Sequence, residues 1–242
     1  MLLTENNLYV RLKTSTKHFH PVVKFDPEKE KLVSFDFTVN NTDLQKIDLS
    51  DTEIFGNYIS GILKQTHAKF GMGGYNELRT VYTRSVLFDD DLNRQSPAEE
   101  PRRLHLGIDI WGDAGTEVFV PWGGMVHSFA FNNNFGDYGA TIVLLHQLEG
   151  LPFFTLYGHV SLVDIQNIRE GAYVSRGQKI AHFGTPEENG HWPPHLHFQV
   201  IQDITPYKGD YPGVCKFSER KKYLLNCPDP DLVLNMQKFI PG

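Results

Sequence analysis

Short β-type segments separated by turns dominate the chain after Arg103, and they constrain the fold more than any other feature. Gly, Asn and Pro residues interrupt the apolar runs, and little helical periodicity is present. Closely spaced short strands are typical of an antiparallel sandwich or barrel-like sheet, so we expect a mainly β fold. The expected strands cover residues 104–110, 117–120, 124–130, 141–146, 153–159, 173–174, 179–183 and 196–201.

The first hundred residues show a different pattern, which predicts an N-terminal α+β extension. Residues 33–39 alternate between apolar and polar types, as expected for a half-buried strand. Ser50 and Glu53 form a capping-box pattern, and apolar residues then recur at helical spacing. This predicts a helix from about residue 51 to 67, and the glycine-rich run at 71–74 disfavours further helix.

These patterns divide the chain into three expected parts. Residues 1–100 form the extension, residues 101–205 form the antiparallel, β-sandwich-like core, and residues 206–242 form an irregular tail that packs on the core. A charged, loop-like stretch at 89–103 lies across the first boundary. The chain shows no internal repeat.

The composition excludes several classes of protein. The chain has 242 residues and a formal net charge of −6 at pH 7, so we expect no nucleic-acid partner. Its 17 Phe, 10 Tyr and 3 Trp are typical of a folded protein rather than a disordered one. The longest run without charges, at 118–136, contains a proline and several glycines, so we expect no membrane span.

The N-terminus lacks the basic start and the long apolar stretch of a secretory signal. We therefore expect a cytoplasmic protein, although export is equally compatible if the chain begins after a removed segment. Cys215 and Cys227 are too few for a disulfide framework, and the sequence leaves open whether they pair. It also leaves the oligomeric state open.

The 11 histidines contrast with the two cysteines and direct attention to a metal site. In the strand expected at 104–110, alternation places His105, Gly107 and Asp109 on one face and aliphatic residues on the other. A fully extended strand would separate the Cα atoms of His105 and Asp109 by about 13 Å, which is too far for ligand bonds of about 2 Å. If both residues bind one metal, the chain must bend between them, and Gly107 permits the bend.

A second pair of histidines, His195 and His197, shares one face of the strand expected at 196–201, and apolar residues occupy the other face. Both imidazoles could bind one metal, or one could bind while the other faces the bound water. Spacing alone does not choose between these arrangements.

A third histidine, His159, ends the strand expected at 153–159, where alternation places Thr155, Tyr157 and His159 on a common face. Any one histidine is more often an ordinary surface or edge residue, but three strand-borne motifs together favour a metal site. Two histidines and Asp109 would leave a fourth tetrahedral position open, as in catalytic zinc sites. Of the remaining histidines, only His191 in the loop before Trp192 is expected near the site, and only weakly.

These residues closely resemble the lysostaphin-type (LytM-like) zinc metallopeptidases. That family shows H-x-x-x-D, then Tyr-x-His at a strand end, then H-x-H and an aromatic residue, and this chain has them in the same order at 105–109, 157–159 and 195–198. Residues 171–181 also resemble the family's G-x-x-V-x-x-G-x-x-I-A stretch. The resemblance covers roughly residues 101–205 and implies a small antiparallel β domain with the site in a groove on one sheet.

The resemblance implies that His105, Asp109 and His197 bind one Zn²⁺ per chain, with His159 and His195 beside the metal. Zinc lowers the pKa of its bound water towards about 7 and polarises the scissile carbonyl. Since the chain has no H-E-x-x-H glutamate, we assign His195 as the general base. His159 would stabilise the oxyanion or protonate the leaving amine, although the two roles could be exchanged.

The implied substrate is a peptide or muropeptide, because the family cleaves peptide bonds in bacterial cell walls, often next to glycine or D-amino acids. Two alternatives stay open: a zinc amidase or peptidase with a small intracellular substrate, and a degenerate, non-catalytic binding module. Asn76 or Glu77 could occupy the open zinc position, although an ordinary turn is the simpler interpretation. Tyr157 is expected to pack rather than to take part in catalysis.

Overall fold

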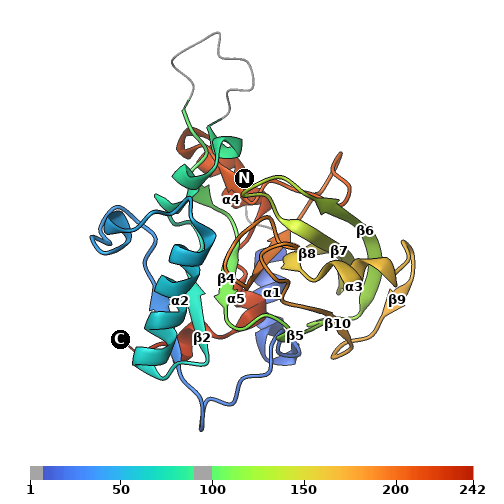
Figure 1. Ribbon diagram of the computed structural model, residues 1–242. Coiled ribbons are helices and arrows are strands. Elements are labelled where there is room, and N and C mark those ends of the chain that lie inside the picture. The colour runs from blue at the N-terminus through green and yellow to red at the C-terminus, as the bar shows by residue number, and fades with distance from the viewer. Residues whose placement is uncertain (1–7, 90–99, 242) are drawn as a thin grey trace.

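A mixed β-sheet forms the centre of the computed structural model, which describes residues 8–89 and 100–241 (Figure 1). Its strands are β1 (Leu32–Phe35), β2 (Phe70–Gly73), β4 (Ile108–Trp111), β6 (Gly124–Asn132), β7 (Gly139–Leu148), β8 (Leu151–Val160), β9 (Tyr173–Val174) and β11 (His195–Ile201). Within the described residues their order is β1-β2-β4-β11-β8-β7-β6-β9. Only β1 and β2 are parallel neighbours among these strands.

Two short antiparallel pairs lie outside this sheet. They join β3 (Leu104–His105) to β12 (Val214–Cys215), and β5 (Glu117–Phe119) to β10 (Lys179–His182). The mainly β prediction is confirmed, and the strands expected after residue 115 are present with shifted ends. The single strand expected at 104–110 is divided into β3 and β4, so the chain is interrupted at Gly107 as a shared metal would require.

The α-helices are fewer than the strands in the described part of the chain. They are α1 (Leu8–Ser15), α2 (Thr52–Thr66), α3 (Leu162–Gln166), α4 (Arg220–Asn226) and α5 (Asp231–Leu234), and the longest of them is α2 with 15 residues. No helix in the described ranges is both long enough and apolar enough to cross a membrane. The C-terminal stretch expected to be irregular thus also contains β12, α4 and α5, whose short lengths leave little periodicity in the sequence.

Helix α2 confirms the helix expected at 51–67, but its N-cap is one residue later than predicted. The carboxylate of Asp51 accepts hydrogen bonds from the backbone N–H groups of Glu53 and Ile54, at 2.8 and 3.0 Å. Ser50 instead donates its hydroxyl to Asp48. The Ser50 capping box is therefore wrong, because an aspartate caps at least as well as a serine and its charge suits the helix N-terminus.

The N-terminal extension contributes strands to the main sheet. β2 lies between β1 and β4, so most of the glycine-rich run at 71–74, which was expected not to be helical, forms a strand. A Cβ atom on Gly71 would lie 1.7 Å from the ring of Phe35, so glycine is required for this close packing. The strand expected at 33–39 is confirmed only over β1, and residues 90–99 of the expected loop lie outside the described residues.

The two faces of the sheet bury different clusters. On one face, side chains such as Ile110 and Phe198 form the main core with residues from α1, α3 and α5. On the other face, Trp111 packs against Phe55 of α2 and against Phe37, with ring centroids 5.8 and 5.3 Å apart. In Figure 1, α2 runs beside β2 and is thereby placed to cover this second face. The histidines of β11 that were predicted to bind or flank a metal lie on the same face as Trp111.

Candidate metal centre and its cavity

Three ligand atoms converge where β3, β4 and β11 meet. His105 Nε2 lies 2.9 Å from His197 Nδ1 and 3.3 Å from Asp109 Oδ1, and His197 Nδ1 lies 3.1 Å from Asp109 Oδ1. Ligands at the corners of a tetrahedron with bonds of about 2 Å are about 3.3 Å apart. Among the described residues, His105, Asp109 and His197 form the group able to hold a metal ion.

Hydrogen bonds on the far side of each imidazole determine its tautomer. His105 Nδ1 lies 2.9 Å from the carbonyl oxygen of Gly74, which can only accept, so His105 carries its proton on Nδ1. Gln199 donates Nε2–H to Pro212 O at 3.3 Å, which directs Oε1 towards His197 Nε2 at 2.9 Å. His197 therefore carries its proton on Nε2.

This arrangement fits a bound cation. His105 Nε2, His197 Nδ1 and Asp109 Oδ1 all present lone pairs to one point, and no proton lies between them. Three such acceptors repel one another unless a positive charge stands among them. Two imidazoles and a carboxylate form a suitable donor set for zinc, and backbone or amide oxygens orient both imidazoles, as is usual around metal-binding histidines.

Gly107 allows His197 to approach the other two ligands. A Cβ atom at this position would lie 2.5 Å from His197 Cε1 and 2.9 Å from the carbonyl oxygen of Phe198. The sequence suggested Gly107 as the place where the chain bends. The structure adds that the absence of a side chain leaves space for a ligand.

A buried arginine outside the predicted core holds the second oxygen of Asp109. Arg79 is 2% exposed and donates NH1–H to Asp109 Oδ2, Nε–H to Glu77 at 2.7 Å and NH2–H to Gly74 O at 3.0 Å. Since Gly74 O also accepts from His105, the segment around 74–79 orients two of the three ligands. Sequence reasoning missed Arg79, because nothing local to Arg79 indicates which carboxylate it will meet.

Two further histidines lie beside the metal ligands, as the resemblance implies. The rings of His159 and His195 are 4.1 Å apart, and His195 stacks on Trp111 at 3.9 Å. Each ring places Nδ1 at 2.8 Å from a backbone carbonyl, which belongs to Asn189 for His159 and to Pro193 for His195. Nε2 of both histidines therefore carries a lone pair.

His159 reaches the site in a different way from the predicted alternation. Tyr157 is fully buried in the main core against Phe198, on the face opposite the site. The side chain of His159 nevertheless lines the cavity with His195, because its φ of 64° lies in the left-handed region and interrupts the alternation. The shared face of Tyr157 and His159 is therefore a wrong prediction, whereas the packing role of Tyr157 agrees with its burial. Left-handed backbone at a non-glycine residue is costly and is typical of functional sites.

Burial determines the charge state of these side chains. Desolvation lowers the pKa of His195 to about 4 and that of His105 to about 3, and it holds the pKa of His159 well below the usual value. Burial acts to raise the pKa of Asp109, but His105 and Arg79 together hold it well below its usual range. At neutral pH Asp109 is thus ionised and the imidazoles of His105, His159 and His195 are uncharged, and a carboxylate with neutral imidazole is the state that binds metal.

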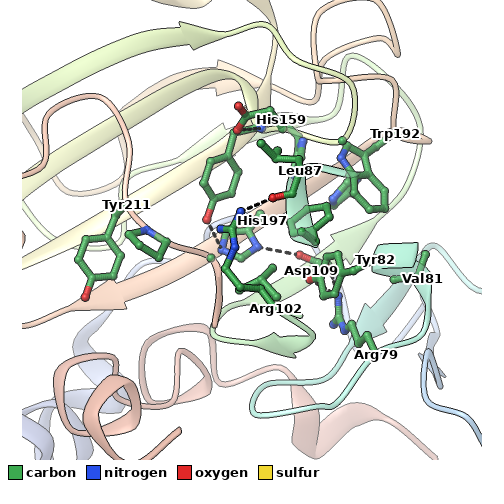
Figure 2. A pocket seen from close by; sticks show the side chains of 18 of the residues that line it. Arg79, Val81, Tyr82, Leu87, Arg102, Asp109, His159, Trp192, His197 and Tyr211 are labelled. Atoms are coloured by element: carbon green, nitrogen blue, oxygen red, sulfur yellow. Dashed lines mark hydrogen bonds and ion pairs between the residues drawn. The ribbon is translucent and has the colours of Figure 1, made fainter. Parts of the chain in front are cut away.

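A cavity of about 290 Å³ opens over Asp109, His197 and the two neighbouring histidines (Figure 2). Tyr138 stands between His159 and His197, with its hydroxyl 3.3 Å from His197 Nε2. Sequence reasoning missed both Tyr138 and Gln199, although Gln199 continues the alternating face of His195 and His197. Much of the lining is aromatic: Tyr82, Phe88, Trp111, Tyr138, Trp192 and Tyr211.

Other residues singled out by the sequence lie elsewhere. Asn76 accepts from Arg220 at 2.8 Å, and Glu77 is paired with Arg79, so neither side chain is directed to the open metal position. His191 stacks on Phe135 and is not part of the cavity lining. Both cysteines, at 215 and 227, are buried and unpaired.

The segment that carries the candidate metal centre is similar to a known protein family. Residues 103–208 match Peptidase family M23. The matched segment contains the three ligands, both neighbouring histidines and the connecting stretch at 171–181. The family resemblance stated for the sequence is thereby confirmed, and the comparison with curated proteins returned no match.

Solved structures with partial similarity include three peptidase-related proteins. The catalytic domain of lysostaphin, an antimicrobial peptidase from Staphylococcus simulans, is 26% identical, with 55% of this chain and 80% of that chain covered and a TM-score of 0.37. A zinc containing peptidase from Vibrio cholerae is 28% identical, with 44% and 30% covered and a TM-score of 0.34. Csd3 from Helicobacter pylori is 24% identical, with 50% and 32% covered and a TM-score of 0.34. The chain thus spans about a third of the length of the last two proteins.

Proposed function

We propose, on the premise that residues 103–208 belong to Peptidase family M23, that this protein is a zinc metallopeptidase with one Zn²⁺ per chain. One observation carries the proposal: the lone pairs of His105, Asp109 and His197 converge on one point beside two uncharged histidines. A degenerate binding module is disfavoured, because loss of catalysis usually removes at least one member of such a set.

The two neighbouring histidines are suited to proton transfer. Bound zinc would supply a water of lowered pKa and a Lewis acid for the scissile carbonyl. His195 accepts the proton of the attacking water at Nε2, since its Nδ1 already donates to Pro193 O. His159 cannot donate from Nε2 in its neutral form, so it acts on the oxyanion or the leaving amine only after it has gained a proton. The two histidines share this geometry, and their roles can be exchanged.

The proposed substrates are peptidoglycan-type or glycine-containing peptides. The M23 family implies a peptide substrate, and the motifs at 105–109, 157–159 and 195–198 support the cell-wall type. A small amide is the second candidate, and the enclosed cavity favours it.

Zinc content and hydrolysis of glycine peptides test the proposal together. We expect one zinc per wild-type chain and none in His105→Ala. His195→Ala should keep its zinc and lose about 100-fold or more in kcat, as is usual when a general base is removed. His18→Ala, at an exposed histidine, serves as the control. A wild-type chain that binds no zinc, or a His195→Ala variant with unchanged turnover, would contradict the proposal.

A further inference from the structure

The proposed catalytic groups lie at the base of a partly open cavity rather than on a flat surface. Asp109, His159, His195 and His197 are each 5% exposed or less. They are reached through a cavity of about 290 Å³ (Figure 2). A polymer cleaved in the middle of its chain must extend in both directions from the scissile bond, whereas the buried groups are reached through this one cavity.

The walls that enclose the site come largely from outside the family-matched segment. Tyr82 and Phe88 line one side and belong to the N-terminal extension, and both are at most 6% exposed. Tyr211 and Val214 line another side and follow the end of the match at residue 208, and both are again at most 6% exposed. The enclosure is therefore a property of this chain and does not follow from its M23 segment alone.

Hydrogen bonds attach the C-terminal wall to the strands that carry the ligands. Gly213 O accepts from Leu106 N at 2.9 Å, and Val214 pairs with His105 through β12 and β3. Pro212 O accepts from Gln199, which also orients His197. Moving this wall away would break contacts that hold the metal ligands.

The N-terminal wall is attached in a similar way. Ser85 donates its hydroxyl to Phe135 O at 2.6 Å, and Arg84 donates to His191 O at 2.8 Å. Both acceptors lie in loops next to the cavity residues Tyr138 and Trp192. Since both walls are held in place, the cavity is preformed and its size is a property of the folded protein.

The volume indicates how large a part of a substrate the cavity can hold. A cavity of about 150 Å³ holds benzene, with six non-hydrogen atoms, so a cavity of about 290 Å³ holds roughly a dozen. This is the size of a dipeptide or of a comparably small amide. A cross-linked wall peptide with its sugars is several times larger.

We propose that, among the candidate substrates named above, the chain takes the small ones: a dipeptide-sized, glycine-containing peptide or amide rather than an intact wall peptide, hydrolysed between the walls formed by the N-terminal extension and the segment after residue 208. This rests on the proposed peptidase function. Water adds across the C–N bond: its hydroxyl goes to the acyl carbon to give a carboxylic acid, and its remaining proton goes to the nitrogen to give the amine. At neutral pH the acid proton passes to the amine, so the products are a carboxylate and an ammonium group. The products are two small molecules, and no other reactant is needed.

A length series on the zinc-loaded full chain tests the size limit. Release of amines from diglycine through hexaglycine, from acetylglycinamide and from purified muropeptides would be measured. We expect kcat/KM to fall about tenfold or more between the dipeptide and the tetrapeptide, with no cleavage of muropeptides. Internal cleavage of hexaglycine or of muropeptides at the dipeptide rate would overturn the size limit while leaving the peptidase function intact.

Binding to the zinc-loaded His195→Ala variant, measured by calorimetry, separates the two proposals. We expect diglycine and acetylglycinamide to bind and hexaglycine to bind about tenfold more weakly or not at all. This preference together with no wild-type hydrolysis of any length would overturn the peptidase function and support the size limit. Equal affinity at all lengths would overturn the size limit.

Widening the cavity provides a second test. Tyr207 lines the cavity, is 38% exposed and packs edge-on against Tyr211, so it stands at the mouth. We expect Tyr207→Ala to raise kcat/KM for the tetrapeptide about tenfold relative to the dipeptide. Tyr173→Ala, at a 69% exposed tyrosine outside the lining, is the matched control. An unchanged length profile in a folded Tyr207→Ala variant would count against the proposal.

Discussion

The family-matched segment and the chain around it contribute different things to one site. Residues 103–208 supply the three candidate metal ligands and both neighbouring histidines, on strands whose pattern can be read locally. The chain outside supplies the buried Arg79, the Gly74 carbonyl and two walls of the cavity. The side chains proposed to bind metal and transfer protons therefore come from residues 103–208. The chain before and after this segment holds them in place and determines the size of the cavity.

The largest expected effect is at Arg79, where the two regions join through a buried ion pair. Arg79→Met leaves the carboxylates of Asp109 and Glu77 without their partner in a dry environment. We expect a loss of about 3–5 kcal/mol in the free energy of unfolding, and a 10- to 100-fold weaker zinc affinity. Urea unfolding and competition with a chelator measure the two effects.

Two further variants control for this result. Arg169→Met, at an exposed arginine, should change neither quantity. Arg79→Lys keeps the positive charge but cannot donate several hydrogen bonds in the fixed geometry of a guanidinium group. Compared with Arg79→Met, it should therefore restore more of the stability than of the zinc affinity. If Arg79→Met binds zinc as tightly as wild type, the chain outside residues 103–208 does not affect zinc affinity through Arg79.

A variant of His146 tests whether the matched segment loses folding stability at low pH for a reason other than protonation of the metal site. His146 is 1% exposed and lies 2.7 Å from Thr155 Oγ1, and burial lowers its pKa to about 4. The unfolded chain takes up a proton near pH 6.5, so the stability contributed by neutral His146 is present above that pH and is lost as the pH falls to about 4.

We therefore expect His146→Gln to be less stable than wild type at pH 7 and to lose less stability on acidification. The difference between the two chains should shrink by about 3 kcal/mol between pH 7 and pH 4. Urea unfolding in the presence of a chelator measures this without a contribution from bound metal. A constant difference across this pH range would show that His146 does not titrate.

Gly107→Ala tests the close approach of ligands within the matched segment. The added Cβ would meet His197 Cε1 at 2.5 Å and would push this ligand away from the other two. We expect a loss of about 1–3 kcal/mol in stability and a clear fall in zinc affinity. Gly56→Ala in α2 is the control, since a Cβ there meets nothing within 4 Å. Wild-type zinc affinity in a folded Gly107→Ala chain would be inconsistent with this role.

Asp51→Ala should have the smallest effect. It tests whether a change at the start of α2, rather than at Arg79, alters zinc affinity. The variant removes the N-cap of α2, which costs about 1 kcal/mol in stability. Zinc affinity should stay unchanged, because Phe55 and its contacts with Trp111 and Trp192 lie one turn further along the helix. A fall in zinc affinity would show that the whole extension, rather than the segment near Arg79, supports the metal.

The strands and the helix at 51–67 could be predicted because their signals are local. Alternation and helical spacing depend on neighbouring residues. The predicted ligand set came from the resemblance to the lysostaphin-type peptidases, since alternation alone left open which histidines bind. His159 shows where alternation fails, since its left-handed backbone reverses the predicted face. Gln199 could have been found, because it lies two residues beyond His197 on the same face.

The sequence by itself determined the mainly β fold, the resemblance of its central segment to the lysostaphin-type peptidases and the three residues that converge as candidate metal ligands. Only the tertiary structure decided that β2 joins the sheet, that Arg79 pairs with Asp109 and that two outer segments enclose the cavity. The physical reason is the distance along the chain. A strand period repeats every two residues, whereas Arg79 and Asp109 are 30 residues apart and meet only because β2 and β4 are neighbours.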